Sequence, residues 1–180
     1  MEKDLAKHIF NNAEWFHLAS CLLNRATSKQ FRLQDQGIKQ HFVYLIPSAI
    51  NRALALELYI KCLYSLEKHE EPIPTHQLEL IFDKLNTSTQ EILDKEFNIY
   101  LNSPKFQERT VLLKKAGCKL APPTNLRNCL QQSGKVFVKA RYLYEGETWS
   151  QNCYDEIRKL LVKMIIIKES SIREWTTPKL

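Results

Sequence analysis

The chain has 180 residues, of which 44% are hydrophobic and 26% are charged, and its formal net charge is +6. This size fits one domain that buries its own core, and the hydrophobic content excludes an intrinsically disordered chain. The basic excess permits an acidic partner such as RNA or a nucleotide, but it falls short of the dense basic arm of a dedicated nucleic-acid-binding protein.

Cysteine usage and the N-terminal sequence bear on the cellular compartment. The first residues are charged and lack the apolar core of a signal peptide, and no apolar run approaches the ~20 residues of a membrane span. An odd number of cysteines without C-x-x-C spacing predicts reduced thiols. We therefore expect a cytoplasmic protein that does not insert into membranes, with free thiols at Cys21, Cys62, Cys118, Cys129 and Cys153.

The first predicted element is a long amphipathic helix over residues 4–25, where apolar residues recur at helical spacing. Residues 27–41 are polar and contain Gly37, which predicts a connection. The apolar stretch 42–46 precedes Pro47, a residue tolerated in the first turn of a helix. It therefore indicates the approach to a second helix or its opening turns.

The second helix is predicted over residues 47–68 and is apolar on nearly every side, which is typical of a central helix. Glu57 and Lys61 lie four residues apart on it, with the acid first, so they can pair with each other. A carboxylate removed from water needs donors, and Arg141 is a candidate from elsewhere in the chain. The apolar positions are Ile50, Ala53, Leu54, Leu56, Leu58, Ile60, Leu63 and Leu66.

Several shorter helices follow a proline-containing loop over residues 69–74. Thr75 is the expected N-cap of a short helix. Ser88 and Glu91 have capping-box spacing, which predicts a helix to about residue 101.

The remaining helices are also marked by caps and breakers. Ser103 and Pro104 open another short helix that ends at Gly117. Asn125 or Thr124 then caps a helix that closes near Gly146.

The last helix, over residues 152–169, has a broad apolar face that either completes the bundle or forms an oligomer interface. Four glycines in 180 residues argue against a sheet. We predict one domain over residues 1–180, an all-α, up-and-down bundle of about five to seven helices.

The segment Arg141-Tyr142-Leu143-Tyr144-Glu145 is the strongest candidate site. Arg141 and Glu145 share a helix face, and Tyr142 and Tyr144 offer aromatic rings with hydroxyl groups. One interpretation is an arginine that holds phosphate or a base while the tyrosines stack on it. The alternative is a buried charge network of these residues with Glu57 and Lys61 that fixes helix register.

Three strings carry a resemblance to a known family. They are ALALELYIKCL over residues 53–63, THQLELIFDKL over residues 75–85 and FVKARYLYE over residues 137–145. Together they resemble bacterial members of the HEPN superfamily (higher eukaryotes and prokaryotes nucleotide-binding domains), most strongly over residues 40–147. The resemblance implies a helical bundle, often a homodimer, in a superfamily that contains metal-independent ribonucleases of defence and toxin-antitoxin systems and non-catalytic binding domains.

One departure from this family removes its catalytic residues. Ribonuclease members resemble one another in an Arg followed, about four to six residues later, by a His on a late helix, a pairing suited to acid/base cleavage of RNA. All five histidines of this chain precede Arg141. The resemblance therefore carries over fold and interaction, and no catalytic residue.

Two further sets of polar residues are candidate sites. His76, expected just inside its helix behind Thr75, is either an acid/base group or a packing and capping residue. Lys135 and Lys139, four residues apart, form a phosphate-facing surface or an ordinary solvated one.

Metal and cofactor sites are not expected. His17 and Cys21 have the spacing of a metal-ligand pair, but two ligands do not make a site. No motif indicates a cofactor.

The sequence favours a non-catalytic HEPN-like binding or assembly module for RNA, a nucleotide or a partner protein. Two alternatives stay open. One is a divergent metal-independent endoribonuclease that uses Arg141 with Glu145 or His76. The other is a structural subunit of a larger complex.

Overall fold

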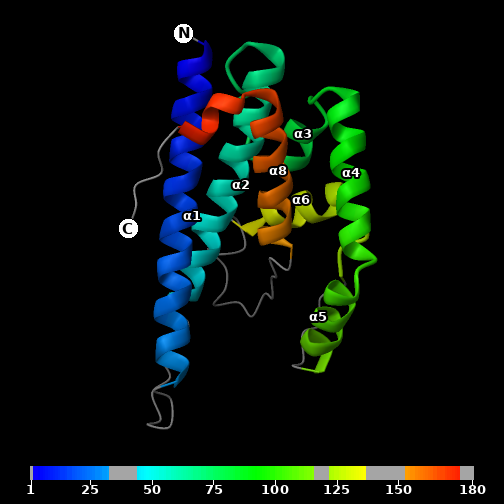
Figure 1. Cartoon of the computed structure of the whole chain (residues 1–180). Coiled ribbons are helices and arrows are strands. Elements are labelled where there is room, and N and C mark those ends of the chain that lie inside the picture. Colours follow the sequence, from blue (N-terminus) through cyan, green and yellow to red (C-terminus); the bar gives the residue numbers. More distant parts are fainter. Residues whose placement is uncertain (1, 33–43, 116–121, 137–152, 175–180) are drawn as a thin grey trace.

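The computed structural model describes residues 2–32, 44–115, 122–136 and 153–174. These residues form seven α-helices and one 3-10 helix, η3 (Ser170–Glu174), and none of them lies in a β-strand. The predicted all-helical bundle is confirmed. Figure 1 shows α1 (Glu2–Arg32), α2 (Leu45–Lys68), α8 (Tyr154–Lys168) and α4 (Thr87–Leu101) side by side, with α3 (Leu78–Phe82) packed on α6 (Leu126–Gly134) behind α8 and α5 (Pro104–Lys115) below α4.

α1 is longer than expected. The sequence predicted a helix over residues 4–25 and a connection from residue 27, but α1 continues to Arg32. The predicted connection is therefore wrong for residues 27–32, and the rest of it lies outside the described residues. No glycine or proline occurs before Gly37, so the backbone has no local reason to leave the helix.

α2 confirms the predicted central helix. It begins at Leu45, so Pro47 lies in the first turn, where its missing N–H breaks no helical hydrogen bond. It ends at Lys68, and His69 adopts a left-handed conformation with φ 58° while its N–H donates to the Ser65 carbonyl at 3.0 Å. Buried residues lie along most of its length.

α3 and α4, the two helices after the loop over residues 69–74, have N-cap residues other than those predicted. α3 begins at Leu78 with Gln77 as its N-cap, so Thr75 and His76 precede the helix. Thr75 Oγ1 instead accepts a hydrogen bond from the Gln77 N–H at 3.2 Å, which closes a turn outside the helix. The N-cap of α4 is Asn86, so the prediction for Ser88 is also wrong.

The caps of α5 and α6 are confirmed. Ser103 Oγ accepts a hydrogen bond from the Phe106 N–H at 3.3 Å, and the Asn125 side chain accepts one from the Asn128 N–H at 2.7 Å. α6 ends at Gly134, so the predicted helix is not continuous up to residue 146.

Two predicted helix ends, Gly117 for α5 and the end near Gly146, lie outside the described residues. α8 begins and ends within two residues of its expected bounds, 152–169.

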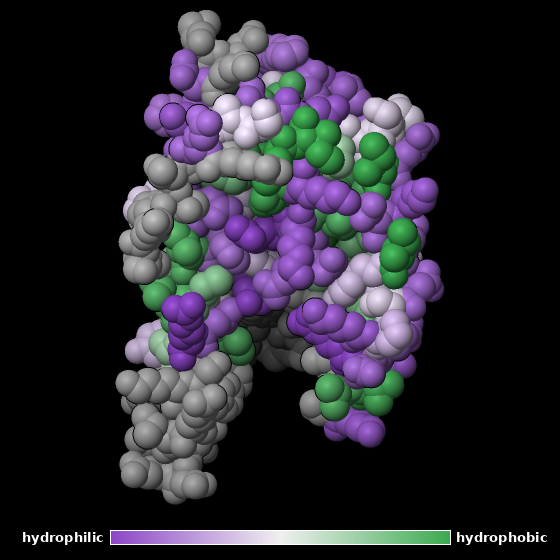
Figure 2. Space-filling model, viewed as in Figure 1, coloured by the Kyte–Doolittle hydropathy of each residue, from purple (hydrophilic) through white to green (hydrophobic). Residues whose placement is uncertain are grey.

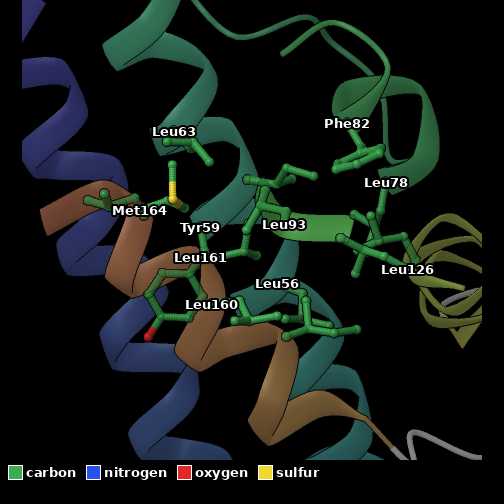
Figure 3. Close-up of a cluster of buried hydrophobic side chains, with 14 of the residues drawn as sticks. Leu56, Tyr59, Leu63, Leu78, Phe82, Leu93, Leu126, Leu160, Leu161 and Met164 are labelled. Atoms are coloured by element: carbon green, nitrogen blue, oxygen red, sulfur yellow. The ribbon is translucent and has the colours of Figure 1, made fainter. Parts of the chain in front are cut away.

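The core lies between α2 and α8 and extends to the shorter helices (Figure 3). Five apolar residues of α8 are buried within the chain, whereas Ile167 stays exposed. On the described part of the face in Figure 2, hydrophobic residues are scattered in small groups among hydrophilic ones. The side chains labelled in Figure 3 are Leu56, Tyr59, Leu63, Leu78, Phe82, Leu93, Leu126, Leu160, Leu161 and Met164.

The carboxylate of Glu67, at the end of α2, connects three helix ends. Its side chain is fully buried, and Lys168 Nζ lies 3.0 Å from Oε1. Oε2 accepts a hydrogen bond from the Asn86 N–H at 2.7 Å, and Oε1 accepts one from the Thr89 hydroxyl. Glu67 therefore binds the N-cap residue and the first turn of α4 and holds them, together with the end of α8, against α2.

We expect Glu67→Gln to lower the free energy of unfolding by about 1–3 kcal/mol, because charge-assisted hydrogen bonds to a buried carboxylate are lost. Glu96→Gln is the matched control, since Glu96 pairs with Lys163 of α8 at 3.4 Å with both side chains largely exposed. The control should cost about 0–1 kcal/mol. Urea unfolding of both variants checks this, and equal losses would show that Glu67 does not anchor these helix ends.

Candidate functional site

The carboxylate of Glu57 brings together three of the predicted site residues. It is 4% exposed on α2. Lys61 Nζ, one turn further along, lies 2.8 Å from Oε1, and His76 Nδ1 lies 3.0 Å from each carboxylate oxygen. The expected pairing of Glu57 with Lys61 is therefore present, and His76 joins it from another part of the chain.

The prediction that His76 lies just inside a helix is wrong. His76 belongs to the non-helical segment before α3, and from there its side chain reaches Glu57. Its imidazole is 79% exposed, although Nδ1 contacts a carboxylate that is only 5% exposed. The ring is thus fixed at one edge and faces solvent over most of its surface.

The end of α6 comes close to the same segment. A Cβ placed on Gly134 would lie 3.4 Å from the His76 carbonyl oxygen, so the missing side chain allows close contact between the two backbones. Val136 is buried against Ala49 and Ala53 on the face of α2 that carries Glu57. The exposed Lys135 lies between these two contacts, at the margin of the site.

The other half of the predicted site lies outside the described residues. It consists of Lys139, Arg141, Tyr142, Tyr144 and Glu145. The contact between Glu57 and Arg141 therefore stays a prediction.

The Glu57 carboxylate orients the imidazole ring of His76. Two acceptor oxygens at Nδ1 favour the tautomer that carries its proton on Nδ1, which leaves Nε2 as the proton-accepting nitrogen in the neutral ring. The exposed edge of the ring can therefore contact a ligand.

Sequence reasoning missed a second polar cluster, between α1, α2 and α8. Glu14, 7% exposed, accepts hydrogen bonds from the Tyr59 hydroxyl and from Arg158 Nη2, the latter at 2.7 Å. Arg158 Nε also donates to the Tyr59 hydroxyl at 3.0 Å. The only sequence signal was an acid within the apolar spacing of the first helix, and its partner is 144 residues away.

His17 and Tyr154 continue this cluster toward the surface. His17 Nδ1 lies 3.0 Å from the Tyr154 hydroxyl, and Arg52 Cζ lies 5.0 Å from the Tyr154 ring centroid. Burial and the nearby charge of Arg158 lower the pKa of His17 below its usual 6.5, and burial raises the pKa of Tyr154. Both rings are therefore held neutral near pH 7.

The cysteines show no metal centre in the part of the chain that is described. Cys21 Sγ lies 3.7 Å from His17 Nε2, but no group of three or more candidate ligands occurs among the described residues. The four described cysteines are free thiols: Cys21, Cys62, Cys129 and Cys153.

The lowered pKa of His17 predicts a loss of stability in mild acid. The unfolded imidazole takes up a proton near pH 6.5 whereas the folded one does not, so the free energy of unfolding should fall as the pH drops below about 6.5. His17→Gln removes the titrating ring and should flatten this part of the profile. Urea unfolding from about pH 7.5 to about pH 5 measures it.

His8→Gln controls for the loss of an imidazole, because His8 is exposed on the same helix. If the His17→Gln variant loses stability in acid as the wild type does, the assignment of this pH dependence to His17 is wrong.

Comparison of the chain with protein-family models, curated proteins and solved structures finds no match. The HEPN resemblance therefore stays a prediction. Among the described residues, no helix has the length and hydropathy needed to cross a membrane.

Proposed function

We propose that this chain is a non-catalytic, HEPN-like binding module for single-stranded RNA, which it contacts at the surface around His76 and Lys135. The observation that carries the proposal is the exposed imidazole of His76, fixed by the buried carboxylate of Glu57. The exposed Lys135 adds positive charge near it, whereas the charge of Lys61 is paired with Glu57. A donor that is already fixed contacts phosphate with little loss of side-chain entropy.

Two further features support RNA as the ligand. The net charge of +6 favours a polyanion over a neutral partner. Tyr142 and Tyr144, a few residues along the chain from Lys135, supply rings of the kind that stack on unpaired bases. A free nucleotide or a partner protein are the competing ligands, and the resemblance to a defence or toxin-antitoxin family is compatible with all three.

We expect the wild-type protein to bind labelled single-stranded RNA more weakly at about 150 mM than at about 50 mM salt, because phosphate contacts release counterions. Lys135→Gln should weaken binding uniformly across sequences and reduce the salt slope by about 1. Lys95→Gln, at an exposed lysine of α4, is the control and should bind as the wild type does. Fluorescence anisotropy measures all three.

Glu57→Gln tests whether the carboxylate positions His76. It removes the charge that holds the imidazole and should weaken RNA binding in the same direction as His76→Gln. An adenosine mononucleotide is the competitor that distinguishes free nucleotide from RNA. Absence of RNA binding by the wild type, or full binding by Lys135→Gln, would refute the proposed RNA surface.

A divergent ribonuclease is the second candidate, and the contact between Glu57 and His76 specifically favours it. A carboxylate-oriented imidazole is suited to take the proton from a 2′-hydroxyl. If the chain is this enzyme, wild-type protein in excess EDTA will cleave RNA, and His76→Ala and Arg141→Ala will lose the cleavage while remaining folded. Our proposal predicts no cleavage by any of the three proteins.

A further inference from the structure

Arg52 lies on the opposite side of α2 from the surface around His76. Glu57 is the fifth residue after Arg52, which places the two side chains about 140° apart around the helix. Tyr59, seven residues after Arg52, shares its face and contacts α1 and α8. A site at Arg52 is therefore separate from the one proposed above.

The guanidinium of Arg52 donates no hydrogen bond to any described residue. Its Nε is buried and has no hydrogen-bond partner, and the structure gives the guanidinium no ion pair among the described residues. Its recorded contact is with the face of the Tyr154 ring, at 5.0 Å. Arg158, the other arginine here, is bound by Glu14 and Tyr59 instead.

The neighbouring side chains of the described residues give the Arg52 guanidinium no hydrogen-bond acceptor. Glu14 already accepts hydrogen bonds from Arg158 and Tyr59. His17, half-buried and bound to the Tyr154 hydroxyl, lies beside the ring that Arg52 contacts. Asp155 of α8 is a second acid that acts on His17 and Tyr154, so the two guanidinium groups of this junction face two carboxylates. The side chains of His17 and Arg52 are both partly exposed.

We propose that Arg52, with His17 and Tyr154 beside it, forms a binding site for a phosphoryl oxyanion at the junction of α1, α2 and α8. An oxyanion supplies an acceptor for the partly exposed guanidinium, whose planar fork matches two oxygens of a phosphoryl group. The Tyr154 ring is already covered by Arg52, so the site recognises the phosphoryl group and not a base. A terminal phosphate of a small ligand fits this chemistry, as does the 5′-phosphate of an RNA.

Inorganic phosphate is the first probe, titrated against chloride at matched ionic strength. A ligand that binds only the folded state at ten times its dissociation constant lowers the unfolding equilibrium constant about elevenfold. We expect this response in the wild-type protein, together with a shift of the His17 imidazole resonances in NMR spectra. Lack of either response would overturn the proposal.

Arg52→Gln should abolish both responses, and Arg52→Lys should weaken them because the charge stays while the fork is lost. Arg127→Gln is the matched control, since Arg127 is exposed and pairs with Asp83 at 2.7 Å. If Arg52→Gln does not fold, Arg52→Lys decides the question. A phosphate response equal to that of the wild type in the Arg52→Lys variant would refute the site.

Two ligand arms distinguish the source of the phosphoryl group. Adenosine 5′-monophosphate against adenosine tests a small ligand, and a short RNA with and without a 5′-phosphate tests the nucleic acid. Binding of either phosphorylated form that Arg52→Gln removes supports the site and identifies its source. RNA binding at His76 should survive Arg52→Gln, so failure of one proposal is distinguishable from failure of the other.

Discussion

α2 is packed by α1 and α8 on one side and by α3 and the end of α6 on the other, so its polar side chains must find partners on neighbouring elements. Glu57 and Tyr59 show this constraint on two faces of the same helix. A carboxylate or hydroxyl without a partner in such a place would cost about 1–3 kcal/mol. The rest of the bundle is arranged so that these partners arrive from distant parts of the chain.

Three carboxylates connect the helices in this way. Glu14 connects α1 to α8 through Arg158, Glu57 connects α2 to the segment before α3, and Glu67 connects α2 to α4 and α8. Each accepts at least two donors, which offsets the cost of removing its charge from water. The apolar core supplies most of the driving force for folding, and these polar contacts define which helices meet and in which register.

The two faces of α2 have different chemistry. At Glu57 the carboxylate is buried and the group it holds, His76, is exposed, so the arrangement presents a fixed imidazole to solvent. At Arg52 the cation itself is partly exposed and lacks an acid partner among the described residues. One face therefore offers a positioned acid/base or phosphate-contacting ring, whereas the other offers an unsatisfied guanidinium.

Local information in the sequence determined the helices themselves, because apolar spacing, caps and breakers act within a few residues. It also placed Lys61 beside Glu57, since four residues make one helical turn. The tertiary structure alone decided that His76 lies outside α3 and contacts Glu57, that Glu67 binds the first turn of α4, and that Glu14 meets Arg158. These contacts depend on how separate helices pack, and a carboxylate's partner across 144 residues leaves no local pattern in the sequence.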